Sequence, residues 1–173
     1  MSRRADTSDA RRAPVAVLGA GSWGTALALH LGRVGVPARL WARDPGLAAS
    51  MRAGRENARY LPGVEMPDGV RVTADASEAL ADSGTVLLAV PSHFVEAVLA
   101  SVGDRVPAHA VLVSATKGLE PRQGLRMSEL LAGRLPGRPV AVLSGPSFAR
   151  EVAQGRPTAL VIASTDEEVA ADL

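Results

Sequence analysis

The chain has 173 residues, a formal net charge of +1 and a hydrophobic content of 47%. This length is typical of one domain with a sizeable core, and the near-neutral charge argues against a nucleic-acid partner. The absence of cysteine excludes disulfides and thiolate metal sites, and no apolar run is long enough to insert into a membrane.

Residues 1–13 are polar and arginine-rich and lack the apolar stretch of a secretory signal. We therefore expect a disordered basic tail there and one folded domain over residues 14–173.

Short apolar runs alternate with helical patterns along this domain. The expected strands are 15–19, 38–42, 70–73, 85–90, 110–114, 140–143 and 158–163. The expected helices are 22–33, 45–55, 76–82, 93–101, 125–134 and 165–173. In the last helix Thr165 is the expected N-cap and Glu168 completes a capping box, while residues 58–69 are expected to be a loop. Apolar strands between helices predict a Rossmann-like, doubly wound α/β fold: a mostly parallel sheet with helices on both faces.

The sequence GAGSWG at residues 19–24 has the spacing G-x-G-x-x-G between the first expected strand and the first expected helix. Gly19 permits the tight turn, Gly21 lets the backbone approach a pyrophosphate, and Gly24 lets the helix pack closely on the strand. The N–H groups and the dipole at the helix start favour phosphate. The turn therefore predicts a dinucleotide site. Trp23 either forms a wall of this site or packs on a neighbouring loop.

Arg43 follows the second expected strand, where NAD-binding folds carry an acidic residue. An acidic residue accepts hydrogen bonds from the ribose 2′-OH, whereas arginine can bind the 2′-phosphate of NADP. Arg43 therefore predicts NADP as the cofactor. NAD is the second choice, because Asp44 would reach the ribose if the strand ran one residue further. A solvent-exposed arginine without a ligand is the alternative interpretation.

Three further motifs follow expected strands, at the carboxyl edge where open α/β sheets bind ligands. They are VPSH at 90–93, SATKGLE at 114–120 and SGPSFA at 144–149. Lys117 is the only lysine beside eighteen arginines, and an ammonium there could bind a phosphate or a polarised carbonyl. Together with GAGSWGTALA at 19–28, the order and intervals of these motifs resemble the bacterial-type NAD(P)-dependent glycerol-3-phosphate dehydrogenase family.

The resemblance implies roles for single residues and an NAD(P)-binding Rossmann domain over residues 14–173. Besides the glycine turn, the positions that contact the cofactor in the family are, in this sequence, Ser22, Trp23, Arg43, Tyr60, Lys117 and Ala149. The positions that contact the substrate are Lys117, Gly145 and Ser147.

The resemblance also implies an activity, the interconversion of dihydroxyacetone phosphate and sn-glycerol 3-phosphate with NAD(P)H, which feeds glycerophospholipid synthesis. A cytoplasmic homodimer is expected, without a metal site. In the family the general acid/base lysine belongs to a helical C-terminal domain, which is expected beyond Leu173. We therefore expect no catalytic residue in this chain and little activity from it alone.

Two other classes of function stay open. One is another NADP-dependent dehydrogenase with a helical C-terminal domain, of the ketopantoate reductase or 3-hydroxyacid type, although these use other residues in place of SATKGLE and SGPSFA. The other is a non-catalytic NADP(H) sensor, and the length of the reading frame would separate the two. His93 lies in the expected crevice, but a histidine at a helix start is more often structural than a general acid.

Overall fold

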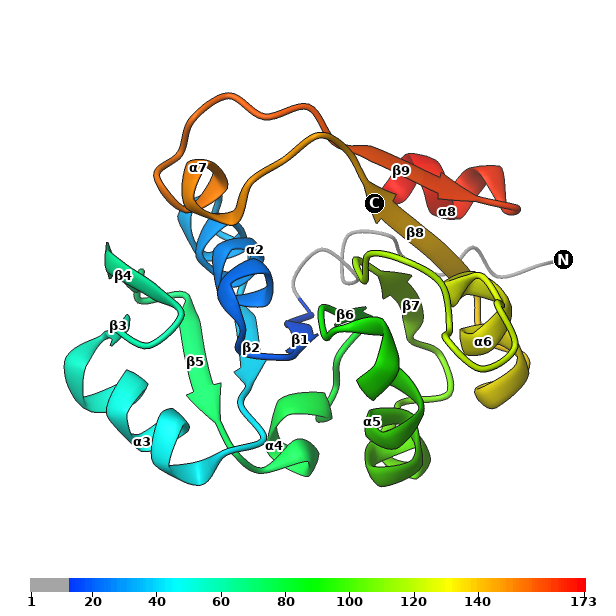
Figure 1. Ribbon diagram of the computed structural model, residues 1–173, viewed down its shortest axis with the longest axis horizontal. Helices are drawn as coiled ribbons and strands as arrows, with labels where there is room; N and C mark the ends of the chain where they lie inside the picture. The colour runs from blue at the N-terminus through cyan, green and yellow to red at the C-terminus, as the bar shows by residue number, and fades with distance from the viewer. Residues whose placement is uncertain (1–12) are drawn as a thin grey trace, which may run out of the picture.

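A seven-stranded sheet forms the centre of the computed structural model, which describes residues 13–173 (Figure 1). Its strand order is β5-β2-β1-β6-β7-β8-β9. In chain order the strands are β1 (Val15–Leu18), β2 (Ala38–Trp41), β5 (Val70–Thr73), β6 (Thr85–Leu88), β7 (Val111–Ser114), β8 (Val140–Ser144) and β9 (Val161–Ser164). All neighbouring pairs are parallel except β8 and β9, which are antiparallel. Because β1 lies between β2 and β6, the strand order reverses there, and such a switch point creates a crevice at the carboxyl edge.

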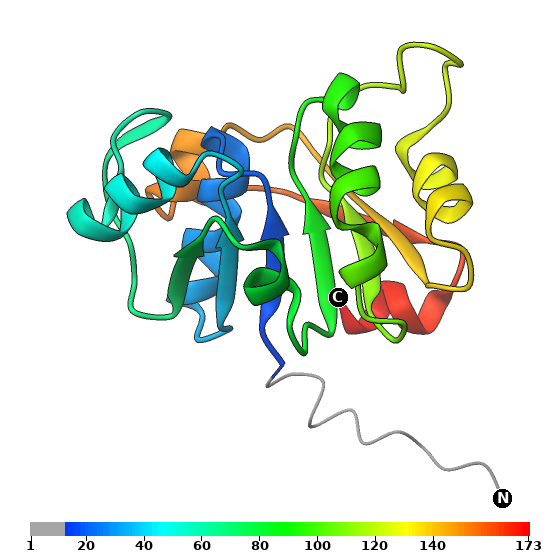
Figure 2. The same cartoon turned by 90° about the horizontal axis from the view of Figure 1, so that it is seen from below.

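Helices cover both faces of this sheet. The α-helices are α2 (Ser22–Arg33), α3 (Pro45–Gly54), α4 (Ala76–Leu80), α5 (Val95–Val102), α6 (Met127–Arg134), α7 (Ala149–Ala153) and α8 (Glu167–Asp172). Two short 3-10 helices, η1 (Ser92–Phe94) and η2 (Gly103–Arg105), flank α5. Helices α2 and α7 pack together on one face, and α4, α5 and α6 lie on the other, in front of the sheet in Figure 2.

The alternation of side chains along each strand divides the core into two clusters. In β1, Val17 belongs to the cluster that includes α2, whereas Ala16 and Leu18 belong to the cluster that includes α5. Successive residues of a strand point to opposite faces, so a strand buried on both sides must be apolar throughout. The predicted Rossmann-like, mostly parallel sheet is confirmed. The tail expected over residues 1–13 lies outside the described residues except for its last position.

The loop expected over residues 58–69 is wrong, because it contains a strand. Strand β4 (Leu61–Glu65) pairs antiparallel with β3 (Glu56–Asn57) in a separate two-stranded ribbon. The pairing jumps from Glu65 opposite Glu56 to Leu61 opposite Asn57, so the ribbon has a bulge. A bulge accommodates the proline and glycine of the LPGVE segment, which otherwise argue against a strand.

The prediction for the last helix was wrong about its N-cap. Asp166, and not Thr165, caps α8, because its side chain accepts hydrogen bonds from the N–H groups of Glu168 and Val169. A carboxylate also interacts favourably with the positive end of the helix dipole, an advantage that a threonine hydroxyl lacks. The preceding strand β9 begins three residues later than expected, at Val161. Of the helices within residues 13–173, none is both apolar enough and long enough to cross a bilayer.

Candidate cofactor and substrate site

The three glycines of the turn after β1 have the geometry that their spacing predicts. Gly19 has φ +118°, and a Cβ there would lie 2.7 Å from the Ala89 carbonyl oxygen. A Cβ on Gly24 would lie only 1.9 Å from the Gly19 carbonyl oxygen, because helix and strand are in close contact. A Cβ on Gly21 would meet no heavy atom of the described residues within 4 Å. Two glycines thus serve the packing of the turn, and the third leaves open space beside the backbone.

The start of α2 is free to bind an anion. Gly21 is the N-cap and offers no side chain, and the first turn contains no acidic residue. The first N–H groups of an α-helix have no acceptor within the helix, and they carry the positive end of its dipole. A pyrophosphate beside Gly21 would supply the missing acceptors, so the residues present fit a dinucleotide.

Asn57 ties the β3–β4 ribbon to this turn. Its buried Nδ2 donates to the Ala20 carbonyl oxygen at 2.9 Å and to Thr25 Oγ1 at 2.7 Å. Its Oδ1 accepts the N–H of Tyr60 at 3.1 Å. Asn57 was not among the residues predicted from the sequence, because its partners Ala20 and Thr25 lie 37 and 32 positions away and no local pattern connects them.

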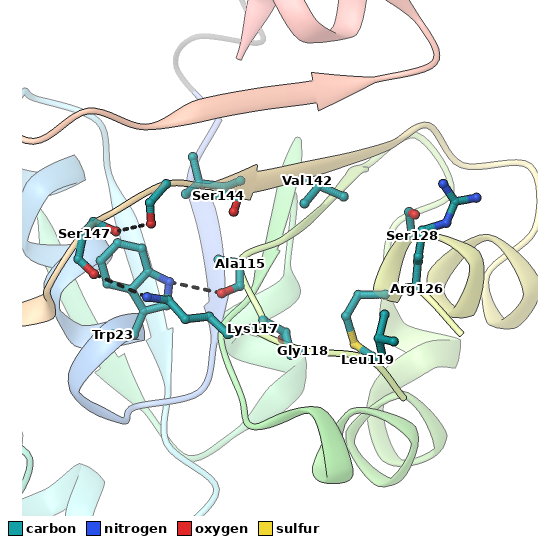
Figure 3. A pocket seen from close by; sticks show the side chains of 14 residues that line it. Trp23, Ala115, Lys117, Gly118, Leu119, Arg126, Ser128, Val142, Ser144 and Ser147 are labelled. Carbon is teal, nitrogen blue, oxygen red and sulfur yellow. Dashed lines mark hydrogen bonds between the residues drawn. The ribbon is translucent and has the colours of Figure 1, made fainter. Parts of the chain in front are cut away.

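A cavity of about 370 Å³ opens at the carboxyl edge, beside the turn (Figure 3). Its lining brings together four of the predicted binding residues, namely Trp23, Lys117, Gly145 and Ser147. The Trp23 indole N–H donates to the Ala115 carbonyl oxygen at 3.1 Å, and Lys117 Nζ donates to the Ser147 carbonyl oxygen at 3.3 Å. Trp23 therefore contacts a neighbouring loop and also lines this cavity, while its contact with the cofactor stays a prediction.

Gly145 shapes one wall of this cavity. Its φ is +154°, and a Cβ there would lie 2.6 Å from the Ala159 carbonyl oxygen. Only glycine fits without a shift of the backbone. Ser147, which is buried, has its Oγ 3.5 Å from the Gly145 carbonyl oxygen, a long and weak contact that leaves the hydroxyl available to a ligand.

Arg43 is exposed beyond the end of β2, and its guanidinium lies over the Phe94 ring, 5.6 Å from the centroid. Strand β2 ends at Trp41 and does not extend toward Asp44. Asp44 is instead the N-cap of α3, where Oδ1 accepts the Gly46 N–H at 2.9 Å. Phe94 is a second residue that sequence analysis missed. It directly follows VPSH in a chain with only two phenylalanines, and an exposed aromatic there was the available signal.

The remaining predicted residues do not line this cavity. Ser22 is exposed in the first turn of α2, and the half-exposed Tyr60 ring lies beneath the Arg59 guanidinium. Ala149 begins α7 and packs against the core. His93 is exposed and its ring centroid is 4.1 Å from that of Phe94. The shifted pKa values belong to exposed ion pairs: hydrogen bonds from Arg126 and Arg134 lower the pKa of Glu129 and Glu96, respectively.

A larger hollow of about 610 Å³ does not suit a dinucleotide. It lies over the amino ends of the central strands, beside Val15, Thr85 and Val111, and mostly apolar side chains line it. Ligands of open α/β sheets bind at the carboxyl ends, where the glycine turn and the lysine are also found. The smaller cavity is therefore the candidate site.

Comparison with known families agrees with this geometry. The family model described as NAD-dependent glycerol-3-phosphate dehydrogenase N-terminus matches residues 14–170. The chain belongs to this family. The resemblance of the four motifs is thereby confirmed.

Relatives in the family share nearly half of their residues with the chain. The glycerol-3-phosphate dehydrogenase (NAD(P)+) of Chelativorans sp. strain BNC1 is 48% identical over 159 residues, which cover 92% of this chain and 49% of that protein. The corresponding protein of Rhodospirillum rubrum is 46% identical over 156 residues, which cover 90% and 45%. The chain thus spans about half the length of the curated relatives it matches.

Solved structures in the family show the same fold. The crystal structure of glycerol-3-phosphate dehydrogenase from Coxiella burnetii superposes with a TM-score of 0.88 at 37% identity, covering 93% of this chain and 49% of that one. Glycerol-3-phosphate dehydrogenase from Plasmodium falciparum gives a TM-score of 0.84 at 25% identity, covering 94% and 48%.

Proposed function

We propose that the full-length protein is a glycerol-3-phosphate dehydrogenase that interconverts dihydroxyacetone phosphate and sn-glycerol 3-phosphate with NADP(H), and less favourably with NAD(H). Residues 14–173 are its cofactor-binding domain. The observation that carries the proposal is that the glycine turn and the Lys117–Ser147 cavity adjoin at one edge of the sheet, in a chain of this family. The reaction would supply glycerol 3-phosphate for glycerophospholipids in the cytoplasm, and a homodimer stays a prediction.

Different residues of the chain bind different parts of the cofactor. Backbone N–H groups at the start of α2 and the Ser22 hydroxyl bind the pyrophosphate, which the open space at Gly21 admits. Arg43 binds the 2′-phosphate, and Tyr60 and Phe94 border the adenosine end. Ala149 lies on the cofactor side of α7. The nicotinamide, when bound, supplies or accepts the hydride.

Lys117 and Ser147 hold the reacting end of the substrate. An ammonium has three donors, and the hydrogen bond to the Ser147 carbonyl uses one of them. The others can bind an oxygen of the substrate and stabilise negative charge on it. Ser147 Oγ and the backbone at Gly145 orient the substrate. We place the lysine that transfers the proton in the half of the relatives that this chain does not span.

The decisive experiment measures NADPH oxidation by the full-length protein with dihydroxyacetone phosphate, ketopantoate and a short 3-oxoacid as alternative substrates. We expect turnover with dihydroxyacetone phosphate only. Turnover with either of the other two would assign the protein to another dehydrogenase class. Tight NADPH binding without turnover of any substrate would favour a sensor.

A further inference from the structure

Trp23 connects the glycine turn to the segment after β7. Its indole N–H donates to the Ala115 carbonyl oxygen at 3.1 Å, across 92 positions of sequence (Figure 3). Ala115 is itself held in place, because its N–H donates to the Leu88 carbonyl oxygen at 2.9 Å. The indole N–H is the only polar group of the ring, so this bond sets its orientation. The half-buried ring is therefore held against Ala115, which lies two residues before Lys117 in the chain.

Lys117 lies over the face of this ring. Its Nζ is 5.7 Å from the ring centroid, within the range of a cation–π interaction, and donates to the Ser147 carbonyl oxygen at 3.3 Å (Figure 3). Lys117 is exposed, and within residues 13–173 it forms no ion pair with an acidic side chain. Because a lysine side chain is long and flexible, these two contacts are what restrict the ammonium to the mouth of the cavity.

We propose that Trp23 is a positioning residue for Lys117: the indole, anchored on Ala115, holds the ammonium where it meets the substrate. This inference rests on the substrate-binding role proposed for Lys117. It assigns Trp23 a task beyond contact with the cofactor. Since Trp23 lies in the first turn of α2, its side chain connects the helix start that we propose for phosphate with the lysine that we propose for substrate.

Two substitutions in the full-length enzyme distinguish the effect of the Trp23 ring from the effect of its hydrogen bond. Trp23→Phe keeps an aromatic face and removes the N–H, whereas Trp23→Leu removes both. We expect Trp23→Leu to lower kcat/KM for dihydroxyacetone phosphate about tenfold and Trp23→Phe about threefold, in line with the usual strength of these contacts. The Kd for NADPH should change less than kcat/KM. A loss of NADPH affinity as large as the loss of kcat/KM would show that Trp23 serves the cofactor and would overturn the inference.

The background Lys117→Met provides the matched control. If Trp23 acts through Lys117, adding Trp23→Leu to Lys117→Met lowers kcat/KM no further. Equal losses in both backgrounds would mean that Trp23 acts independently of the lysine and would overturn the inference. Absence of turnover in the wild-type enzyme would instead refute the proposed function.

A spectroscopic measurement tests the same contact without any substrate. In lysine-labelled full-length protein, the Lys117 side-chain signal is identified as the one that Lys117→Met removes. We expect its methylene resonances upfield because of the Trp23 ring current, at a similar position in Trp23→Phe, and shifted toward the free-lysine position in folded Trp23→Leu. An unchanged signal in Trp23→Leu would show that the ring does not hold the lysine.

Discussion

The Asp44 carboxylate is shared between the start of α3 and the Arg59 guanidinium. Oδ1 accepts the Gly46 N–H, and Oδ2 lies 3.6 Å from Arg59 Nη1. Both side chains are more than half exposed, at 55% and 61%, so the pair itself contributes only about 0.2–1 kcal/mol. The pair matters for the charge around Arg43, because Asp44 directly follows Arg43 in the chain and Arg59 offsets the negative charge of Asp44. The cation that we propose for the 2′-phosphate therefore lies next to a carboxylate that already has a counter-ion, which reduces the repulsion of that phosphate.

Arg43→Ala should therefore weaken NADPH binding far more than NADH binding. Only NADPH carries the 2′-phosphate, and a charge-assisted hydrogen bond contributes about 1.5–3 kcal/mol, or about ten- to hundredfold in Kd. Calorimetric titration of the full-length protein with each cofactor measures both constants. Equal losses for the two cofactors would place the discrimination elsewhere.

Arg59→Gln should reduce the preference for NADPH more mildly. The substitution leaves Asp44 without its counter-ion, and the exposed carboxylate then repels the 2′-phosphate across solvent, so we expect about a threefold higher Kd for NADPH. NADH should bind as before. The double variant Asp44→Asn/Arg59→Gln is the control, since removal of both charges should restore NADPH affinity. A persistent loss in the double variant would mean that Arg59 contacts the cofactor directly.

Gly21→Val and Gly24→Ala should separate binding from folding within one motif. The side chain at position 21 would enter open space, so the variant should keep its Tm but bind NADPH at least about tenfold more weakly, because the pyrophosphate can no longer approach the backbone. The methyl group at position 24 would collide with the Gly19 carbonyl, and such overpacking costs about 1–3 kcal/mol of unfolding free energy. Thermal unfolding and NADPH titration measure the two effects. Unchanged NADPH affinity in folded Gly21→Val would refute the role of the turn.

Asn57→Ala should destabilise the domain by about 1–3 kcal/mol, because it leaves buried polar groups without partners. The groups affected are the Ala20 carbonyl and the Thr25 hydroxyl, and the Tyr60 N–H loses its acceptor as well. Since the same contacts hold the ribbon against the glycine turn, NADPH affinity should also fall. Chemical denaturation measures the free energy of unfolding of Asn57→Ala and of the surface variant Ala58→Ser, and the latter should match wild type. Wild-type stability in Asn57→Ala would show that the hydrogen bonds of Asn57 do not contribute to the stability of the domain.

The order of elements along this chain could be predicted from the sequence because it depends on local preferences. The apolar run of β1, the helical spacing of α2 and the glycines between them act over a few residues, and their predicted ends agree with the structure to within a residue. The N-cap of α8 also depends on local preferences, but it was predicted one residue too early because the two candidate caps, Thr165 and Asp166, are adjacent. The β3–β4 ribbon escaped prediction because its bulge places proline and glycine inside a strand.

What the sequence by itself determined is the parallel α/β architecture, the glycine turn and the motifs that carry the family. Only the tertiary structure decided which side chains meet at the site: the indole of Trp23 with Ala115, the amide of Asn57 with Ala20, and the guanidinium of Arg43 with Phe94. In the structure β2 ends at Trp41, and Asp44 is the N-cap of α3. The physical reason is range: backbone preferences act between neighbours in sequence, whereas these contacts form only after strands distant in sequence have paired and brought their carboxyl ends to one edge.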